Sequence, residues 1–300
     1  MERAYAVDAA TRGKIVRVTT VLSIQSHVSY GHAGNSSAVF PLQRRGIEVW
    51  PVHTVTFSNH TGYGDWEGPL IPAEDIAAVI RGVDRRGALA RTDAVLSGYL
   101  GGEEVGDKIL EAVALVKDRN PKALYCCDTV MGDIDRGFYV RPGIPEFFRD
   151  RVAPAADVLT PNHFELNFLV GRDATTLDEV VAGIEEMRAK GPRTILVTSV
   201  ETPDVSEGSL AMIAADDTGV YRVETPELDR KFTGSGDLTA AVFLSELLAG
   251  HPLDTALEQT AGAVFGVLAA TAEAERSELM IVGAQEEIAA PSRHFTVTKL

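Results

Sequence analysis

Residues 92–128 read TDAVLSGYLGGEEVGDKILEAVALVKDRNPKALYCCD. The two short apolar runs, 92–99 and 122–128, are typical of buried strands, whereas the stretch between them, 103–119, has the apolar spacing of a helix. The runs are continuous rather than alternating, which is the pattern of strands whose two faces are both covered. This strand-helix-strand unit therefore predicts a parallel sheet with helices packed on it.

The same alternation continues along the whole chain, and DDTG separates the last two strands in a hairpin-like turn. The predicted strands are 14–25, 47–57, 92–99, 122–128, 156–160, 193–199, 208–214 and 219–225. The predicted helices are 34–45, 73–81, 103–119, 164–170, 177–190, 235–249 and 253–272. This order predicts an α/β fold, a three-layer α/β/α sandwich with a mostly parallel central sheet. We expect a single domain over 14–300, preceded by a flexible leader at 1–13.

Composition limits the classes of partner. The 300 residues include 28 Lys and Arg against 43 Asp and Glu, a net charge of −15, which disfavours nucleic acid and anionic membranes. No apolar run approaches the ~20 residues of a membrane span, and the N-terminus lacks a signal-peptide core. The only two cysteines, Cys126 and Cys127, are adjacent, which predicts core packing on opposite faces of a strand rather than a disulfide or zinc framework. A cytoplasmic location is expected.

Polar residues gather where the predicted strands end. They are Gln25, Ser26, His27, 57–61, Tyr99, Asp128, 160–162, Thr198 and Ser199. In open α/β sheets, ligands bind beyond the carboxyl ends of the strands, so these residues are expected to share one site.

The stretch FTGSGDLTAAVF, residues 232–243, places Asp237 behind two glycines at the start of an apolar helix. Free amides and the positive dipole end would form a nest for a phosphoryl group, and the dipole would keep Asp237 ionised as a base for an attacking alcohol. The alternative is a simple helix cap. A P-loop and a dinucleotide fingerprint are both missing from the sequence.

Two sets of acidic residues each allow both a structural and a functional interpretation. Asn162 and Glu165 form either a capping box or, through a magnesium ion and its waters, a phosphate site. Asp128, Asp133 and Asp135 suit a hard cation with phosphate co-ligands, but a solvated turn is the alternative, chiefly for Asp135.

Two glycine-containing stretches, 23–37 and 57–66, combine hydroxyls, imidazoles and aromatic rings that could orient a small polar ring. His27 and His32 are expected to be structural, whereas His60, at a strand end, is the better candidate for a ligand contact. Tyr99 would either stack on an aromatic substrate or pack in the core.

Taken together, seven stretches resemble the motifs of the pyridoxal kinases, a family of the ribokinase-like superfamily. They are SIQSHVSYGHAGN, VTFSNHTGYGDW, VLSGYLG, CDTVMGD, TPNHFEL, VTS and GSGDL, in the family's order, and the likeness extends from about residue 20 to the C-terminal TKL. The resemblance implies phosphorylation of the 5′-hydroxyl of pyridoxal, pyridoxine and pyridoxamine by ATP in vitamin B6 salvage. It also implies Mg²⁺, a homodimer and, as a further candidate, a monovalent cation such as K⁺.

The resemblance also implies a role for each matching residue. Asp237 matches the catalytic base, and Gly234, Ser235 and Gly236 match the anion hole. The residues matching the vitamer pocket are Ser26, Phe57, His60, Thr61, Gly62 and Tyr99. Those matching the ATP site are Asp128, Asp133, Thr160, Asn162, Glu165, Thr198 and Ser199, with Asp128 and Glu165 at the metal. Residues 221–232 would form a loop over adenine.

Two residues depart from the family pattern. Thr129 stands in place of a usual proline, which is expected to loosen the loop beside the metal, and Ser235 replaces a common threonine but keeps its hydroxyl. The alternatives for function are a hydroxymethylpyrimidine or sugar kinase of the same fold and a non-catalytic protein that binds B6 vitamers.

Overall fold

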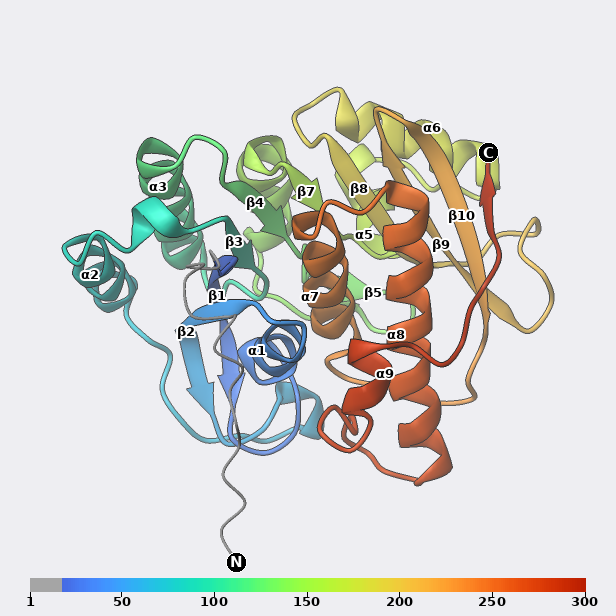
Figure 1. Ribbon diagram of the computed structural model, residues 1–300, viewed down its shortest axis with the longest axis horizontal. Coiled ribbons are helices and arrows are strands. Elements are labelled where there is room, and N and C mark those ends of the chain that lie inside the picture. Colours follow the sequence, from blue (N-terminus) through green and yellow to red (C-terminus); the bar gives the residue numbers. More distant parts are fainter. Residues whose placement is uncertain (1–17) are drawn as a thin grey trace, which may run out of the picture.

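One mixed sheet runs through residues 18–300, the part of the chain that this computed structural model describes (Figure 1). Its strand order is β11-β10-β9-β8-β7-β4-β3-β1-β2. The strands are β1 Thr20–Val28, β2 Glu48–Phe57, β3 Ala94–Ser97, β4 Leu124–Cys127, β7 Val158–Leu159, β8 Thr194–Val200, β9 Ser209–Asp216, β10 Gly219–Pro226 and β11 Val297–Lys299. Neighbours are parallel from β2 to β8 and antiparallel from β8 to β11.

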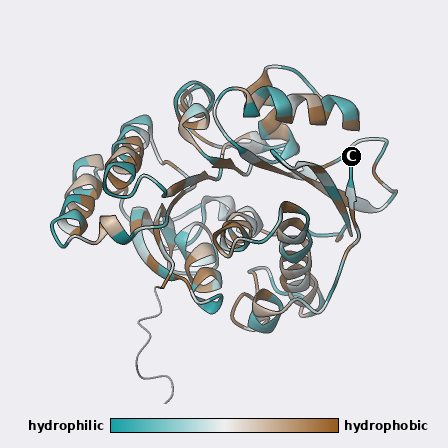
Figure 2. Cartoon of the chain, turned by 45° about the horizontal axis from the view of Figure 1, so that its top comes forward, coloured by the Kyte–Doolittle hydropathy of each residue, from teal (hydrophilic) through white to brown (hydrophobic). Residues whose placement is uncertain are grey.

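Helices cover both faces of this sheet, as Figure 2 shows. One layer consists of α1 Asn35–Arg44, α7 Ser235–Leu248, α8 Leu253–Glu273 and α9 Gln285–Ala289. The other layer consists of α2 Ala73–Asp84, α3 Glu103–Arg119, α4 Ile144–Phe147, α5 His163–Val170 and α6 Leu177–Arg188. The predicted three-layer sandwich is therefore confirmed.

Alternate residues of the central strands enter different cores, because successive side chains of a strand point to opposite faces. In β4, Tyr125 and Cys127 pack with the α2–α6 layer, whereas Cys126 packs with α1, α7 and α8. Both cysteines are free and fully buried, as predicted. Burial raises the pKa of the Cys127 thiol to about 12 and that of Cys126 well above its usual value.

The structure differs from the predicted elements mainly where strands are short or irregular. The hairpin of β9 and β10 is confirmed, but β11 and the small pair β5 Gly132–Asp133 and β6 Gly137–Phe138 were not predicted, because two or three residues carry no periodicity. β1 continues beyond the predicted end at Gln25, with a register shift around Ser26. The predicted leader at 1–13 and the first residues of the predicted first strand, 14–17, lie outside the described residues.

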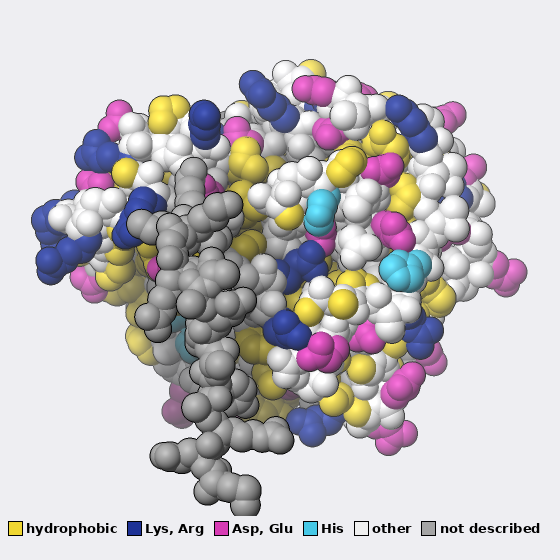
Figure 3. Space-filling model, in the orientation of Figure 1, with side chains coloured by type: hydrophobic (Ala, Val, Ile, Leu, Met, Phe, Trp, Pro, Cys, Tyr) yellow, Lys and Arg dark blue, Asp and Glu magenta, His cyan; other side chains and the backbone are white. Residues whose placement is uncertain are grey.

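The surface is mixed in charge on the face shown in Figure 3, where acidic and basic side chains alternate except for a basic group near α2. Within residues 18–300, no helix has the length and apolar character that a membrane span requires.

Candidate functional site

A cavity of about 1330 Å³ opens at the carboxyl ends of the parallel strands and is lined by every residue that the family resemblance places in the site. Those residues are Ser26, Phe57, His60, Thr61, Gly62, Tyr99, Asp128, Asp133, Thr160, Asn162, Glu165, Thr198, Ser199, Gly234, Ser235, Gly236 and Asp237. The strand order divides the cavity. β2, β1 and β3 border one end, β8, β9 and β10 border the other, and β4, β7 and the start of α7 lie between them. The convergence predicted from the strand ends is therefore observed in part. The exceptions are Gln25, which is buried and donates to Ser23 Oγ at 3.0 Å, and His27, Ser58, Asn59 and Pro161, which do not line the cavity.

The first turn of α7 is built so that its amides face this cavity. Gly234 precedes the helix at φ 84°, where a Cβ would lie 2.0 Å from the backbone oxygen of His32, so a side chain would be both strained and obstructed. No side chain caps the helix. The hydroxyl of Ser235 donates to the carbonyl of Phe232 at 2.9 Å and thus holds the turn. The N–H groups at the helix start remain available to an anion.

Asp237 is the third residue of α7 and accepts a hydrogen bond from the backbone N–H of Gly34. Burial nevertheless raises its pKa to about 6, and the bond from Gly34 only partly opposes this shift. Desolvation thus has the larger effect on this pKa, which lies above its ordinary value although the carboxylate is at a helix N-terminus. At neutral pH a carboxyl with this pKa is still mostly ionised, and it is basic enough to accept a proton.

Asp128 lies beside this turn, after β4, and is 5% exposed. Its Oδ1 accepts a hydrogen bond from Thr160 Oγ1 at 3.1 Å. Its buried Oδ2 has no partner among residues 18–300 and faces Gly236, where a Cβ would lie 3.7 Å away. Burial, then the charges of Asp237 and Glu165, raise the pKa of Asp128 well above its usual value. An unpartnered oxygen among like charges fits a cation.

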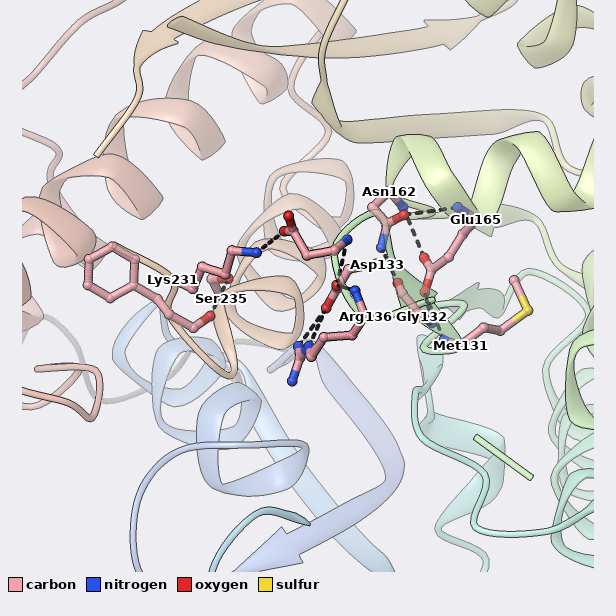
Figure 4. Close-up of polar contacts among 10 residues, drawn as sticks. Met131, Gly132, Asp133, Arg136, Asn162, Glu165, Lys231 and Ser235 are labelled. Atoms are coloured by element: carbon pink, nitrogen blue, oxygen red, sulfur yellow. Dashed lines mark hydrogen bonds and ion pairs between the residues drawn. The ribbon is translucent and has the colours of Figure 1, made fainter. Parts of the chain in front are cut away.

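Glu165, by contrast, is satisfied within the protein (Figure 4). Its Oε1 accepts from the N–H of Met131 at 2.8 Å and of Gly132 at 3.3 Å, and its Oε2 accepts from the N–H of Asn162 at 3.0 Å. Asn162 Oδ1 accepts from the N–H of Glu165 at 2.9 Å, which completes the capping box. The capping alternative is therefore confirmed, and the geometry argues against direct metal ligation by Glu165.

The fourth donor to Glu165 is Thr129, whose Oγ1 lies 3.1 Å from Oε2. Thr129 is fully buried, and proline at this position would have no hydroxyl to donate. The expectation that Thr129 loosens this loop was therefore wrong, because its side chain ties residue 129 to α5.

Replacing Thr129 by valine removes this hydroxyl while keeping the shape of the side chain. We expect it to lower the free energy of unfolding by about 1–2 kcal/mol, because a buried charged acceptor loses one donor. Urea unfolding followed by circular dichroism measures the change. An unchanged transition midpoint would show that the bond contributes nothing.

The end of the cavity near β1 and β2 is apolar. Val28, Val55 and Phe57 form a buried cluster with Ala33 and Tyr99 packed against it, and all five line the cavity. Polar groups border this chamber: Ser26 lies at the irregularity of β1, and His60, Thr61 and Gly62 lie at the short helix Thr61–Tyr63. An apolar wall with a few polar groups suits a small aromatic ring.

Two ion pairs lie among the residues that line the cavity (Figure 4), and one of them is beside the apolar chamber, since Arg136 Nη1 would lie 3.8 Å from a Cβ on Gly62. Arg136 Nε donates to Asp133 Oδ2 at 2.8 Å, and Lys231 pairs with Asp135 across the opening. Asp135 is exposed, as its predicted place in a solvated turn requires. Of the loop predicted at 221–232, the first part belongs to β10 and only the residues after Pro226 form a loop.

The cavity wall also includes residues that the sequence analysis did not single out. Leu210 and Met212 come from β9, and Val264, Phe265 and Leu268 come from α8. Their apolar side chains resemble ordinary core residues, so no sequence signal distinguishes them. Of the two histidines expected to be structural, His27 stacks on His53 with ring centroids 4.4 Å apart, whereas the buried Nδ1 of His32 has no hydrogen-bond partner within residues 18–300.

Comparison with known proteins adds an independent observation. A sequence model of the phosphomethylpyrimidine kinase family matches residues 68–279. The chain is 52% identical over 280 residues to a pyridoxal kinase of Leifsonia xyli, covering 93% of this chain and 99% of that protein. The structure of this chain is similar to that of a pyridoxal kinase from Leishmania donovani bound to ADP and ginkgotoxin, with a TM-score of 0.87 and 29% sequence identity. The match covers 94% of this chain and 99% of that one. The same kinase bound to ADP and pyridoxamine superposes with a TM-score of 0.85, at 28% identity and the same coverage.

Proposed function

The chain belongs to the pyridoxal kinase family, and from this premise we propose that it transfers the γ-phosphoryl group of ATP to the 5′-hydroxyl of pyridoxal. The observation that carries the proposal is the position of Asp237. Its carboxylate lies at the uncapped start of α7, in the same cavity as the apolar chamber and the basic side chains of Arg230 and Lys231. A base and an anion nest at one point are what phosphoryl transfer to an alcohol requires.

In the proposed reaction, the chamber formed by Val28, Val55 and Phe57 holds the pyridine ring with its hydroxymethyl group toward α7. Asp237 accepts the hydroxyl proton as the oxygen forms a bond to the γ-phosphorus. The bond to the bridging oxygen breaks, and ADP leaves with that oxygen. The amides of Ser235 and Gly236 stabilise the charge on the transferring oxygens.

Asp128 is the residue we assign to Mg²⁺, because its Oδ2 is buried and has no partner in the part of the chain that the structure describes. Within residues 18–300, no cluster of three or more His, Cys, Asp and Glu side chains is arranged to hold a metal alone, which suits a cation that takes phosphate oxygens as further ligands. Such a cation would neutralise charge on the phosphates. Glu165 acts indirectly, by holding the backbone of Met131 and Gly132 in the loop after Asp128.

Initial rates on different alcohols test the proposed substrate. We expect pyridoxal, pyridoxine and pyridoxamine to be phosphorylated with a kcat/KM at least about tenfold above that of hydroxymethylpyrimidine, because the relatives that are 52% identical to this chain are pyridoxal kinases. Ribose should be a still poorer substrate. ADP formation measured with each alcohol provides the comparison.

A preference for hydroxymethylpyrimidine would instead favour the alternative of a hydroxymethylpyrimidine kinase. This alternative agrees with the match to the phosphomethylpyrimidine kinase family. Binding of pyridoxal without ADP formation would favour a non-catalytic vitamer-binding protein. The homodimer, the cytoplasmic location and a monovalent cation stay predictions from the resemblance.

A further inference from the structure

Glu278, in the segment after α8, is a buried carboxylate that the sequence analysis did not single out. The residue is 9% exposed. The residues hydrogen-bonded to its oxygens precede it in the sequence by more than 200 positions. Oε2 accepts a hydrogen bond from the backbone N–H of His32 at 2.9 Å. Oε1 accepts from the hydroxyl of Tyr63 at 2.6 Å and lies 3.2 Å from Nε2 of His60. One carboxylate therefore holds two loops.

We call these loops the two cover loops: residues 29–34, which follow β1, and residues 58–66, which follow β2. Near their bases they are joined by backbone bonds from Ser29 to Phe57, at 2.9 Å, and from Tyr30 to Ser58, at 2.8 Å. Beyond those bonds, the carboxylate of Glu278 joins the backbone of the first loop, at His32, to the side chains of His60 and Tyr63 in the second. Both loops contribute to the wall of the apolar chamber.

The fit around Glu278 is close. Gly31, in the first cover loop, has φ +84°, and a Cβ on it would lie 2.1 Å from Glu278 Oε2. In the second cover loop, the rings of His60 and Tyr63 lie 4.5 Å apart. The bond from Tyr63 to Glu278 therefore fixes a ring that in turn packs on His60, a residue of the cavity wall.

We propose that Glu278 is a positioning residue that fixes both cover loops around the vitamer end of the cavity. This inference rests on the proposed function, since it concerns how that substrate is held. Glu278 is not one of the residues that line the cavity, and it acts through His60 and the backbone of His32. Its loss should loosen the wall around the vitamer while leaving the nucleotide end intact.

Steady-state kinetics of Glu278→Ala test this role. We expect the KM for pyridoxal to rise by about tenfold, because charge-assisted bonds to both loops are lost. The KM for ATP should stay within about twofold of the wild-type value, and ATP hydrolysis without vitamer should increase as water enters the chamber. Glu278→Gln, which keeps the length of the side chain and can still bond to both loops, should restore most of the affinity.

Tyr63→Phe provides a second test that does not depend on a buried substitution, since Tyr63 is 44% exposed. It should raise the KM for pyridoxal in the same direction. Combined with Glu278→Ala it should add little, because the two side chains act through one contact. Glu273→Ala, which removes a charge at the exposed end of α8, is the matched control and should leave both KM values unchanged.

Three results would overturn the inference: an unchanged KM for pyridoxal in Glu278→Ala, an equal rise of both KM values, or fully additive effects with Tyr63→Phe. If the wild-type protein itself does not phosphorylate pyridoxal, the proposed function fails and the inference fails with it. Normal wild-type activity with an unaffected Glu278→Ala variant refutes the role of Glu278 alone.

Discussion

Replacing Asp237 by asparagine should lower kcat by about 10³-fold or more, because the amide cannot accept the proton of the attacking hydroxyl. The KM for ATP should change little, since the amides of α7 remain. The same substitution should raise the stability of the folded protein at neutral pH. A variant that is inactive yet more stable is the signature expected of a buried catalytic carboxylate.

The gain in stability follows from the raised pKa of Asp237, about 6 against an ordinary value of 3.8. A carboxyl whose pKa is higher in the folded state favours folding below pH 3.8, and that contribution is lost as the pH rises through about 6. At pH 7 to 8 the ionised group therefore destabilises the fold, by about 1–3 kcal/mol. Asparagine removes this penalty.

Thermal unfolding at several pH values, measured beside turnover, checks both effects. The melting temperature of Asp237→Asn should exceed that of the wild-type protein at pH 8, and the difference should shrink toward pH 4. Wild-type kcat should fall about tenfold per pH unit below pH 6 as Asp237 becomes protonated. Near-normal turnover in the variant would remove Asp237 as the base.

Replacing Glu165 by glutamine should have the opposite effect on stability, although it too exchanges an acid for an amide. Glu165 accepts bonds from three backbone N–H groups and one hydroxyl, so a side-chain NH₂ would face donors it cannot accept from. Burial raises the pKa of Glu165 to about 7 against an ordinary 4.5, so removing its charge offsets part of this effect. We still expect a net loss of about 1–2 kcal/mol, because several buried donors are left unsatisfied at once. Turnover should fall by about tenfold, since the loop beside Asp128 would shift.

A matched control is present in α6, where Glu179 closes an equivalent capping box with Thr176 at an exposed position. Glu179→Gln should cost less than about 1 kcal/mol because water can replace its bonds. Urea unfolding of both variants provides the comparison. Equal losses would mean that Glu165 contributes only a helix cap and does not hold the loop at 129–132.

Sequence patterns predicted the fold well because its parallel strands are continuous apolar runs with polar residues at one end. Gly234 and Asp237 could be placed at a helix start, and Asp128 after a strand, from local signals alone. Glu278 could not be placed, since its partners are more than two hundred residues away in the chain and only folding brings them together. The raised pKa of Asp237 was not predicted for a similar reason, because burial is a tertiary property.

The strand order also determines how the sheet ends. β2 forms one edge, and strands with open edges tend to add further chains and aggregate. Here Pro51 deprives the first half of that edge of a donor, while backbone bonds from Thr56 to Pro69, at 3.0 Å, and from Ile71 to Thr54, at 3.0 Å, cover the second half. The second cover loop, which forms part of the cavity wall, thus continues into residues 69–71, and these cover the edge of β2 against pairing with another chain.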